Sequence, residues 1–130
     1  MKNSLEYAWA AGFIDGDGNI RWRLDPKRNE NRSRQYGCFL IQAGQVSRNV
    51  LDRLSKILGG KVYGPYFKRE NDYFQFCVVG AEATKSYSNI RPYLSRVKKL
   101  QGDKALQEYI KFSKRPRLGN GIQRKNELKK

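Results

Sequence analysis

Apolar residues along this chain switch from helical spacing to strict alternation and back, twice within 112 residues. Helical spacing places apolar side chains on one stripe of a helix, whereas alternation places them on one face of a strand. Each helical segment is followed by two alternating segments, so the pattern predicts two α-β-β units and further helix. The expected helices cover residues 5–16, 47–58, 81–89, 93–99 and 103–112, and the expected strands cover 19–25, 35–43, 61–67 and 72–79.

This order predicts an α+β fold of the type αββαββα. The four strands form a mostly antiparallel sheet with the helices on one face. The first strand indicates what the other face carries, because its two sides differ sharply. Polar and charged Asn19, Arg21, Arg23 and Asp25 alternate with apolar Ile20, Trp22 and Leu24. We therefore expect a basic face opposite the helices.

The net charge predicts a polyanionic partner. The chain has 27 basic and 12 acidic residues, a formal charge of +15. Residues 111–130 contain eight basic residues and one acid, and residues 1–110 are basic as well. Nucleic acid is the first candidate and an anionic membrane surface the second, because the tail lacks an amphipathic helical pattern. We expect one domain over residues 1–112 and a basic, flexible tail over residues 113–130, with no membrane partner and no small-molecule substrate.

The absence of histidine restricts the chemistry open to this chain. It excludes Ser-His-Asp and Cys-His catalysis and any histidine-ligated metal. Two cysteines, Cys38 and Cys77, cannot supply a four-thiolate zinc site and are interpreted as reduced thiols on strands. Catalysis would then use carboxylates, lysine, arginine, hydroxyls, water or a metal held by oxygen.

The end of the first expected helix carries the most informative stretch, AAGFIDGDG at residues 10–18. Ala8, Gly12 and Gly16 are spaced by four, so they line one helix face without bulk and allow a second helix to approach closely. Asp15 and Asp17 lie at the negative end of the helix, where carboxylates are unfavourable unless a divalent cation binds. The alternative interpretation of these Asp and Gly residues is an ordinary turn.

With Trp9 before it, this stretch resembles the signature of the LAGLIDADG homing endonucleases, except that Ala10 stands where Leu is usual. The element order also resembles that family, as do the segment from Leu51 to Tyr63 and the Pro92-Tyr93-Leu94 element before Lys98 and Lys99. The resemblance covers residues 5–112 and includes a single motif. Because chains with two motifs pair their motif helices internally, one motif implies a saddle-shaped homodimer. The implied interface consists of Ala8, Gly12, Ile14, Asp15 and Gly16.

The resemblance also implies a metal site. Asp17, with the main-chain carbonyl of Gly16, would bind Mg²⁺, for which Mn²⁺ would substitute, while Asp15 is expected to be structural. A polar residue near the end of the second strand and a basic residue near the later helix would organise the water around the metal. Strand phase favours Gln42 over Gln45 for the first role, and Lys98 is favoured over Lys99 for the second.

The outer face of the sheet would read DNA. Its candidates are Arg21, Arg23, Asp25, Arg32, Arg34, Tyr36, Gln42, Lys61, Tyr63, Tyr66, Lys68, Tyr73 and Gln75. The resemblance implies a homodimeric, Mg²⁺-dependent DNA endonuclease that hydrolyses both strands of a long pseudo-palindromic site and acts in intron homing. The alternative is an intron maturase or a non-cleaving DNA- or RNA-binding protein of the same fold. We expect an intracellular protein; an organelle, a phage-infected cell and a bacterial cytoplasm all fit.

Overall fold

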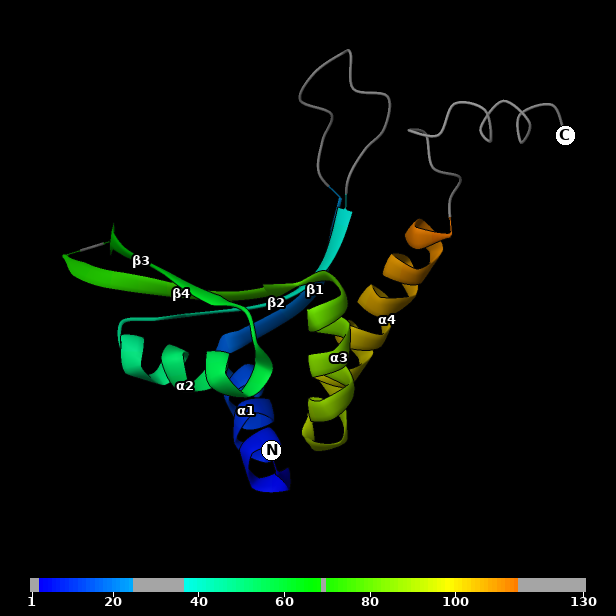
Figure 1. Cartoon of the computed structure of the whole chain (residues 1–130), viewed down its shortest axis with the longest axis horizontal. Helices are drawn as coiled ribbons and strands as arrows, with labels where there is room; N and C mark the ends of the chain where they lie inside the picture. The colour runs from blue at the N-terminus through cyan, green and yellow to red at the C-terminus, as the bar shows by residue number, and fades with distance from the viewer. Residues whose placement is uncertain (1–2, 25–36, 69, 115–130) are drawn as a thin grey trace, which may run out of the picture.

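A computed structural model describes residues 3–24, 37–68 and 70–114, and Figure 1 shows their arrangement. The element order confirms the two α-β-β units. The elements are α1 (Ser4–Asp17), β1 (Gly18–Leu24), β2 (Gly37–Gln45), α2 (Arg48–Leu58), β3 (Lys61–Lys68), β4 (Asn71–Val79), α3 (Gly80–Ile90), the short 3₁₀ helix η1 (Arg91–Tyr93) and α4 (Arg96–Ser113).

The four strands form one sheet in the order β1-β2-β4-β3, and every neighbouring pair is antiparallel. The helices lie on one face, which confirms the expected layers (Figure 1). The register places Ile20 opposite Ile41 and Ile41 opposite Val78, so one apolar row crosses three strands. This row faces the helices and forms the floor of the core.

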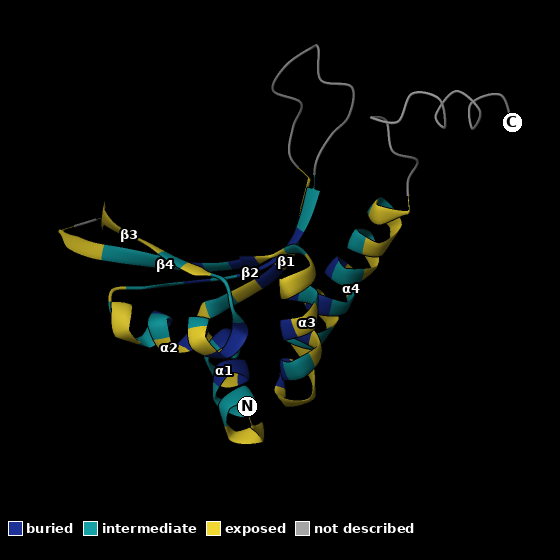
Figure 2. Cartoon of the chain, viewed as in Figure 1, coloured by how far each residue is buried: buried dark blue, intermediate teal, exposed yellow. Residues whose placement is uncertain are grey.

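The core lies between the sheet and the helices, where the dark residues gather in Figure 2. Ile14 of α1, Phe39 of β2, Leu54 of α2, Phe76 of β4 and Tyr87 of α3 are all almost completely buried. Burying a side chain of this size stabilises the fold by about 1.5–3 kcal/mol. Because the five residues come from five different elements, their burial in one core holds these elements together. None of the helices in the described residues is long and apolar enough to span a bilayer.

The C-terminal helical region differs from the sequence expectation. We expected separate segments over residues 93–99 and 103–112, but α4 runs without interruption from Arg96 to Ser113. A glycine inside a helix costs only about 1 kcal/mol, so the helix continues through Gly102. The position requires glycine because a Cβ there would collide with the ring of Tyr87. The ring of Tyr87, from α3, therefore packs against the backbone of α4 at Gly102.

A polar contact holds Tyr87 in this position. Its hydroxyl lies 2.7 Å from Asp103 Oδ1, and Arg91 donates to both oxygens of Asp103 at 2.9 and 2.8 Å. The hydrogen bonds from Arg91 lower the pKa of Asp103 to about 2, while burial is the main cause that raises the pKa of Tyr87. These three residues tie α3, η1 and α4 together.

Gly102→Ala is expected to destabilise the protein by about 1–3 kcal/mol, because overpacking against a fixed ring outweighs the roughly 1 kcal/mol helix preference of alanine. Urea-induced unfolding followed by circular dichroism measures this change. The exposed neighbour Gln101 supplies the control, since Gln101→Ala should shift stability by less than about 0.5 kcal/mol. An unfolding midpoint for Gly102→Ala at or above that of the parent protein would contradict the packing explanation.

Candidate active site

Helix α1 passes directly into strand β1, and Asp17 is the last residue of the helix. The turn interpretation of the Asp-Gly stretch is therefore wrong. Gly18 has extended backbone, and it is small because a Cβ there would lie 2.6 Å from the side chain of Ile14. This tight junction leaves the carboxylate of Asp17 exposed where the helix meets the sheet.

Gln45, the alternative to Gln42, is the glutamine that contacts Asp17. Its Nε2 donates to Asp17 Oδ2 at 3.1 Å, and its Oε1 accepts from the backbone N–H of Val46 at 3.0 Å. Strand β2 extends two residues beyond the expected end, which brings Gln45 to the end of α1. Gln42 pairs with Cys77 on the outer face of the sheet, so its placement beside Asp17 is wrong.

Lys98 reaches the same junction from α4. Its Nζ donates to the main-chain carbonyl of Gly18 at 2.8 Å, one residue after Asp17. The alternative, Lys99, has its charge near Asp103, where it helps to lower the pKa of that carboxyl, and its carbonyl accepts from the hydroxyl of Tyr87 at 3.1 Å. Asp17, Gln45 and Lys98 therefore converge on the junction from three separate elements.

Asp15 is engaged within the chain. Both of its carboxylate oxygens accept from the backbone N–H of Ser95, at 3.1 and 3.0 Å, and the Ser95 hydroxyl donates to it at 3.0 Å. These bonds connect the end of α1 to the start of α4, which is the contact expected of a structural residue. Asp17 is thus the acid of the motif whose carboxylate stays open to a ligand.

The small-residue stripe lies on the open side of α1. Gly12 and Gly16 are exposed, and a Cβ at either would meet nothing within 4 Å. Ala8 is half-buried, and Leu5 on the same side is 81% exposed. Ile14 is completely buried in the core of the chain itself, so its expected place at an interface between copies is wrong.

The outer face of the sheet carries most of the described candidates for DNA binding. The exposed ones are Arg21, Arg23, Lys61, Tyr63 and Tyr66, and the half-buried ones are Gln42, Tyr73 and Gln75. Lys68 ends β3, and its side chain lies outside the described residues, as do Asp25, Arg32, Arg34 and Tyr36. The tail from residue 115 onward lies outside them as well.

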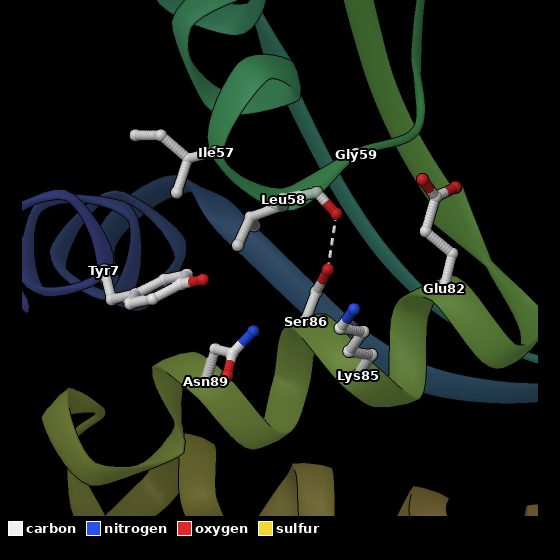
Figure 3. A pocket seen from close by; sticks show the side chains of 8 residues that line it. All are labelled: Tyr7, Ile57, Leu58, Gly59, Glu82, Lys85, Ser86 and Asn89. Atoms are coloured by element: carbon white, nitrogen blue, oxygen red, sulfur yellow. Dashed lines mark hydrogen bonds between the residues drawn. The ribbon is translucent and has the colours of Figure 1, made fainter. Parts of the chain in front are cut away.

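A pocket of about 220 Å³ opens on the helical side, between α1, α2 and α3 (Figure 3). It is lined by Tyr7, Ile57, Leu58, Gly59, Glu82, Lys85, Ser86 and Asn89. The Ser86 hydroxyl donates to the carbonyl of Leu58 across one wall, which joins α3 to α2. No candidate residue from the motif lines this pocket, and the exposed Asp17 places the junction on the surface instead.

Comparison with known proteins agrees with this geometry. The family model described as LAGLIDADG endonuclease matches residues 10–115, a range that begins in the middle of α1 and includes the whole of α4.

The chain belongs to the LAGLIDADG endonuclease family.

Individual relatives give the same fold. The LAGLIDADG chain is 31% identical over 109 residues to the DNA endonuclease I-CvuI of Chlorella vulgaris, an alignment that covers 82% of this chain and 65% of that protein. A crystal structure of the homing endonuclease I-CvuI in complex with its target, in the presence of calcium, matches with a TM-score of 0.65 and 30% identity, over 80% of this chain and 65% of that one. The homing endonuclease I-TnaI matches in fold, with a TM-score of 0.62, 21% identity, and coverage of 82% and 73%. This chain therefore spans about two thirds of the length of I-CvuI.

The donor set of this LAGLIDADG chain suits a hard cation that is shared with other ligands. No group of three or more histidine, cysteine or acidic residues gathers in the part of the chain that the structure describes. Mg²⁺ commonly binds through one or two carboxylates and completes its shell with water and substrate phosphates. The exposed Asp17 fits that requirement, and so does the carbonyl of Gly16, which lies in the last turn of α1 where carbonyls lack intrahelical donors.

Proposed function

We propose that this chain is a homodimeric, divalent-metal-dependent DNA endonuclease that cuts both strands of a specific, pseudo-palindromic site. The observation that carries the proposal is the exposed Asp17 at the end of a glycine-lined helix, with Gln45 and Lys98 beside it. The family and the DNA-bound I-CvuI structure support the same activity.

Mg²⁺ is the proposed metal, and Mn²⁺ is expected to replace it. Asp17 and the carbonyl of Gly16 would hold it. When bound at a scissile phosphate, such a cation neutralises developing charge and lowers the pKa of an attacking water, so that no histidine is needed. The residues of this chain then have distinct tasks: Gln45 orients the Asp17 carboxylate, and Lys98 places a positive charge at the junction.

Two copies are needed because one chain offers one open motif carboxylate and one motif helix. The stripe of Ala8, Gly12 and Gly16 allows two α1 helices to pack backbone to backbone about a two-fold axis. That arrangement brings the two Asp17 residues together, one for each DNA strand. The two outer sheet faces then form a continuous saddle over the duplex.

On this saddle, Arg21 and Arg23 are the proposed readers of base edges, since arginine binds guanine bidentately in the major groove. Gln42 and Gln75 suit adenine, and Lys61 suits phosphate. The two-fold symmetry of the protein predicts a site with related half-sites.

The activity is tested on a plasmid library in which each molecule carries a long randomised insert. The purified chain is incubated with the library and MgCl₂, and linearised plasmids are recovered and sequenced. We expect one enriched, pseudo-palindromic sequence, and no linear product when EDTA replaces Mg²⁺. Specific retention of plasmids without linearisation would overturn the proposed cleavage and favour a non-cleaving nucleic-acid-binding protein.

The thiols test the position of the DNA face. Cys38 and Cys77 are both half-buried thiols on the outer face, and burial is the main cause that raises the pKa of Cys77. Alkylation with N-ethylmaleimide at mildly alkaline pH is expected to weaken DNA binding at least about tenfold, comparable to losing one base contact. A gel-shift titration against the selected duplex measures this loss. The DNA affinity of the Cys38→Ser/Cys77→Ser variant should not change on treatment with the reagent. Unchanged affinity of the alkylated parent protein would show that DNA binds elsewhere.

A further inference from the structure

A chain of hydrogen bonds connects the motif helix to Lys98. Asp15 accepts from the backbone N–H and the hydroxyl of Ser95, the residue that precedes α4. The Ser95 hydroxyl oxygen in turn accepts from the backbone N–H of Lys98 at 3.4 Å. Lys98 Nζ then donates to the carbonyl of Gly18, three residues after Asp15. The path therefore leaves α1 at Asp15 and returns to the same junction.

Electrostatics explain why an acid lies at position 15. A carboxylate at the C-terminal end of α1 faces the negative end of that helix dipole, which is unfavourable. The same carboxylate lies at the N-terminal end of α4, where free N–H groups and the positive end of the dipole favour it. The second helix thus compensates the charge that the first one opposes.

We propose that Asp15 and Ser95 are positioning residues that fix Lys98 beside Asp17. This inference rests on the proposed function, which it deepens. A lysine side chain is long and flexible, so its ammonium group stays at one point only if its backbone is held. The Asp15–Ser95 contact fixes the backbone of the first turn of α4. From that position the Lys98 side chain is long enough for its Nζ to reach the carbonyl of Gly18.

A purely structural role would give a different result, because α4 is also held elsewhere. The contact of Arg91, Asp103 and Tyr87 fastens α4 to η1 and α3, and it involves neither Asp15, Ser95 nor the side chain of Lys98. Asp103→Asn therefore serves as the matched control. It weakens the attachment of α4 without touching Asp15, Ser95 or Lys98.

The experiment compares single-turnover cleavage with DNA affinity, on the duplex selected by the parent chain. Ser95→Ala is expected to slow cleavage about 100-fold, the effect of misplacing a reacting group by about 1 Å, while its Kd for the duplex stays within about twofold. Ser95→Thr retains the hydroxyl and should restore the rate. Asp15→Asn, which keeps one acceptor oxygen, should give an intermediate rate and serves as the second variant if Ser95→Ala does not fold. Asp103→Asn should cut at the parent rate at temperatures where it is folded.

A double-mutant cycle shows whether the effect passes through Lys98. If it does, Ser95→Ala adds little to the loss already caused by Lys98→Ala. Full additivity of the two losses would overturn the proposal, and so would an unchanged rate in both Ser95→Ala and Asp15→Asn. A crystal structure of Ser95→Ala provides a readout without activity, since Lys98 Nζ should leave hydrogen-bond distance of the Gly18 carbonyl. If the parent chain cuts no DNA, the proposed function fails by itself, and this distance alone decides the positioning role.

Discussion

Asp17→Asn should reduce double-strand cleavage at least about 1000-fold while leaving the fold and the affinity for DNA intact. The expected loss corresponds to the several kcal/mol that a bound cation contributes to stabilising charge in the transition state. Asparagine has nearly the same shape and can still accept from Gln45, so the junction keeps its hydrogen bond. What it lacks is the negative charge that holds a divalent ion.

Single-turnover cleavage of the selected duplex measures this effect, and a gel shift measures binding separately. Asp72→Asn provides the control, because it removes an exposed carboxylate opposite Phe67, near the turn between β3 and β4. Cleavage by Asp17→Asn within tenfold of the parent rate would remove Asp17 from the metal site. Loss of binding in parallel with cleavage would instead assign this side chain to DNA recognition.

Gly12→Arg should convert the proposed homodimer into a well-folded monomer. Its Cβ meets nothing within 4 Å in the chain itself, and arginine is a better helix former than glycine. Between two α1 helices packed as proposed, however, two large side chains of like charge would have to occupy space that this packing leaves to backbone alone. At about 1–3 kcal/mol of overpacking for each copy, the dissociation constant of the proposed dimer should rise at least about 30-fold.

Sedimentation velocity over a range of concentrations measures this change, and plasmid linearisation should fall with the dimer fraction. Ser88→Arg, at an exposed position of α3, introduces the same side chain away from the stripe and should leave the dimer unchanged. A Gly12→Arg variant that stays dimeric would place the interface elsewhere. A parent chain that is monomeric both in solution and on its duplex would remove the homodimer from the proposal.

The layered fold could be predicted from the sequence because each helix or strand has its own spacing of apolar residues. The alternation of Ile20 and Trp22 with Arg21 and Arg23 needs no distant partner to be understood. The continuity of α4 could not be predicted in this way. Gly102 is a helix breaker by propensity, and only its contact with Tyr87, fifteen positions earlier in the chain, shows why the helix tolerates it.

The site was predictable in part for the same reason. Asp17 and Lys98 follow from the motif and the resemblance, and the structure brings both to the junction. Strand phase favours Gln42 because it lies on the outer face, whereas the residue beside Asp17 is Gln45, at the end of β2 where the sheet meets α1. The inward orientation of Ile14 cannot be predicted from the motif alone, because the motif does not show which side of α1 packs against the core.

The absence of any loop between α1 and β1 has a consequence for the spacing of the DNA site. In the proposed dimer, the segment that meets the other subunit continues without a hinge into the segment that carries Arg21 and Arg23. Any tilt of one subunit against the other would therefore move Arg21 and Arg23 by the same rotation, because no flexible loop separates them from α1. The backbone of the dimer would then fix the distance between the two half-sites. Side-chain movements alone could not accommodate a target with one base pair inserted at its centre.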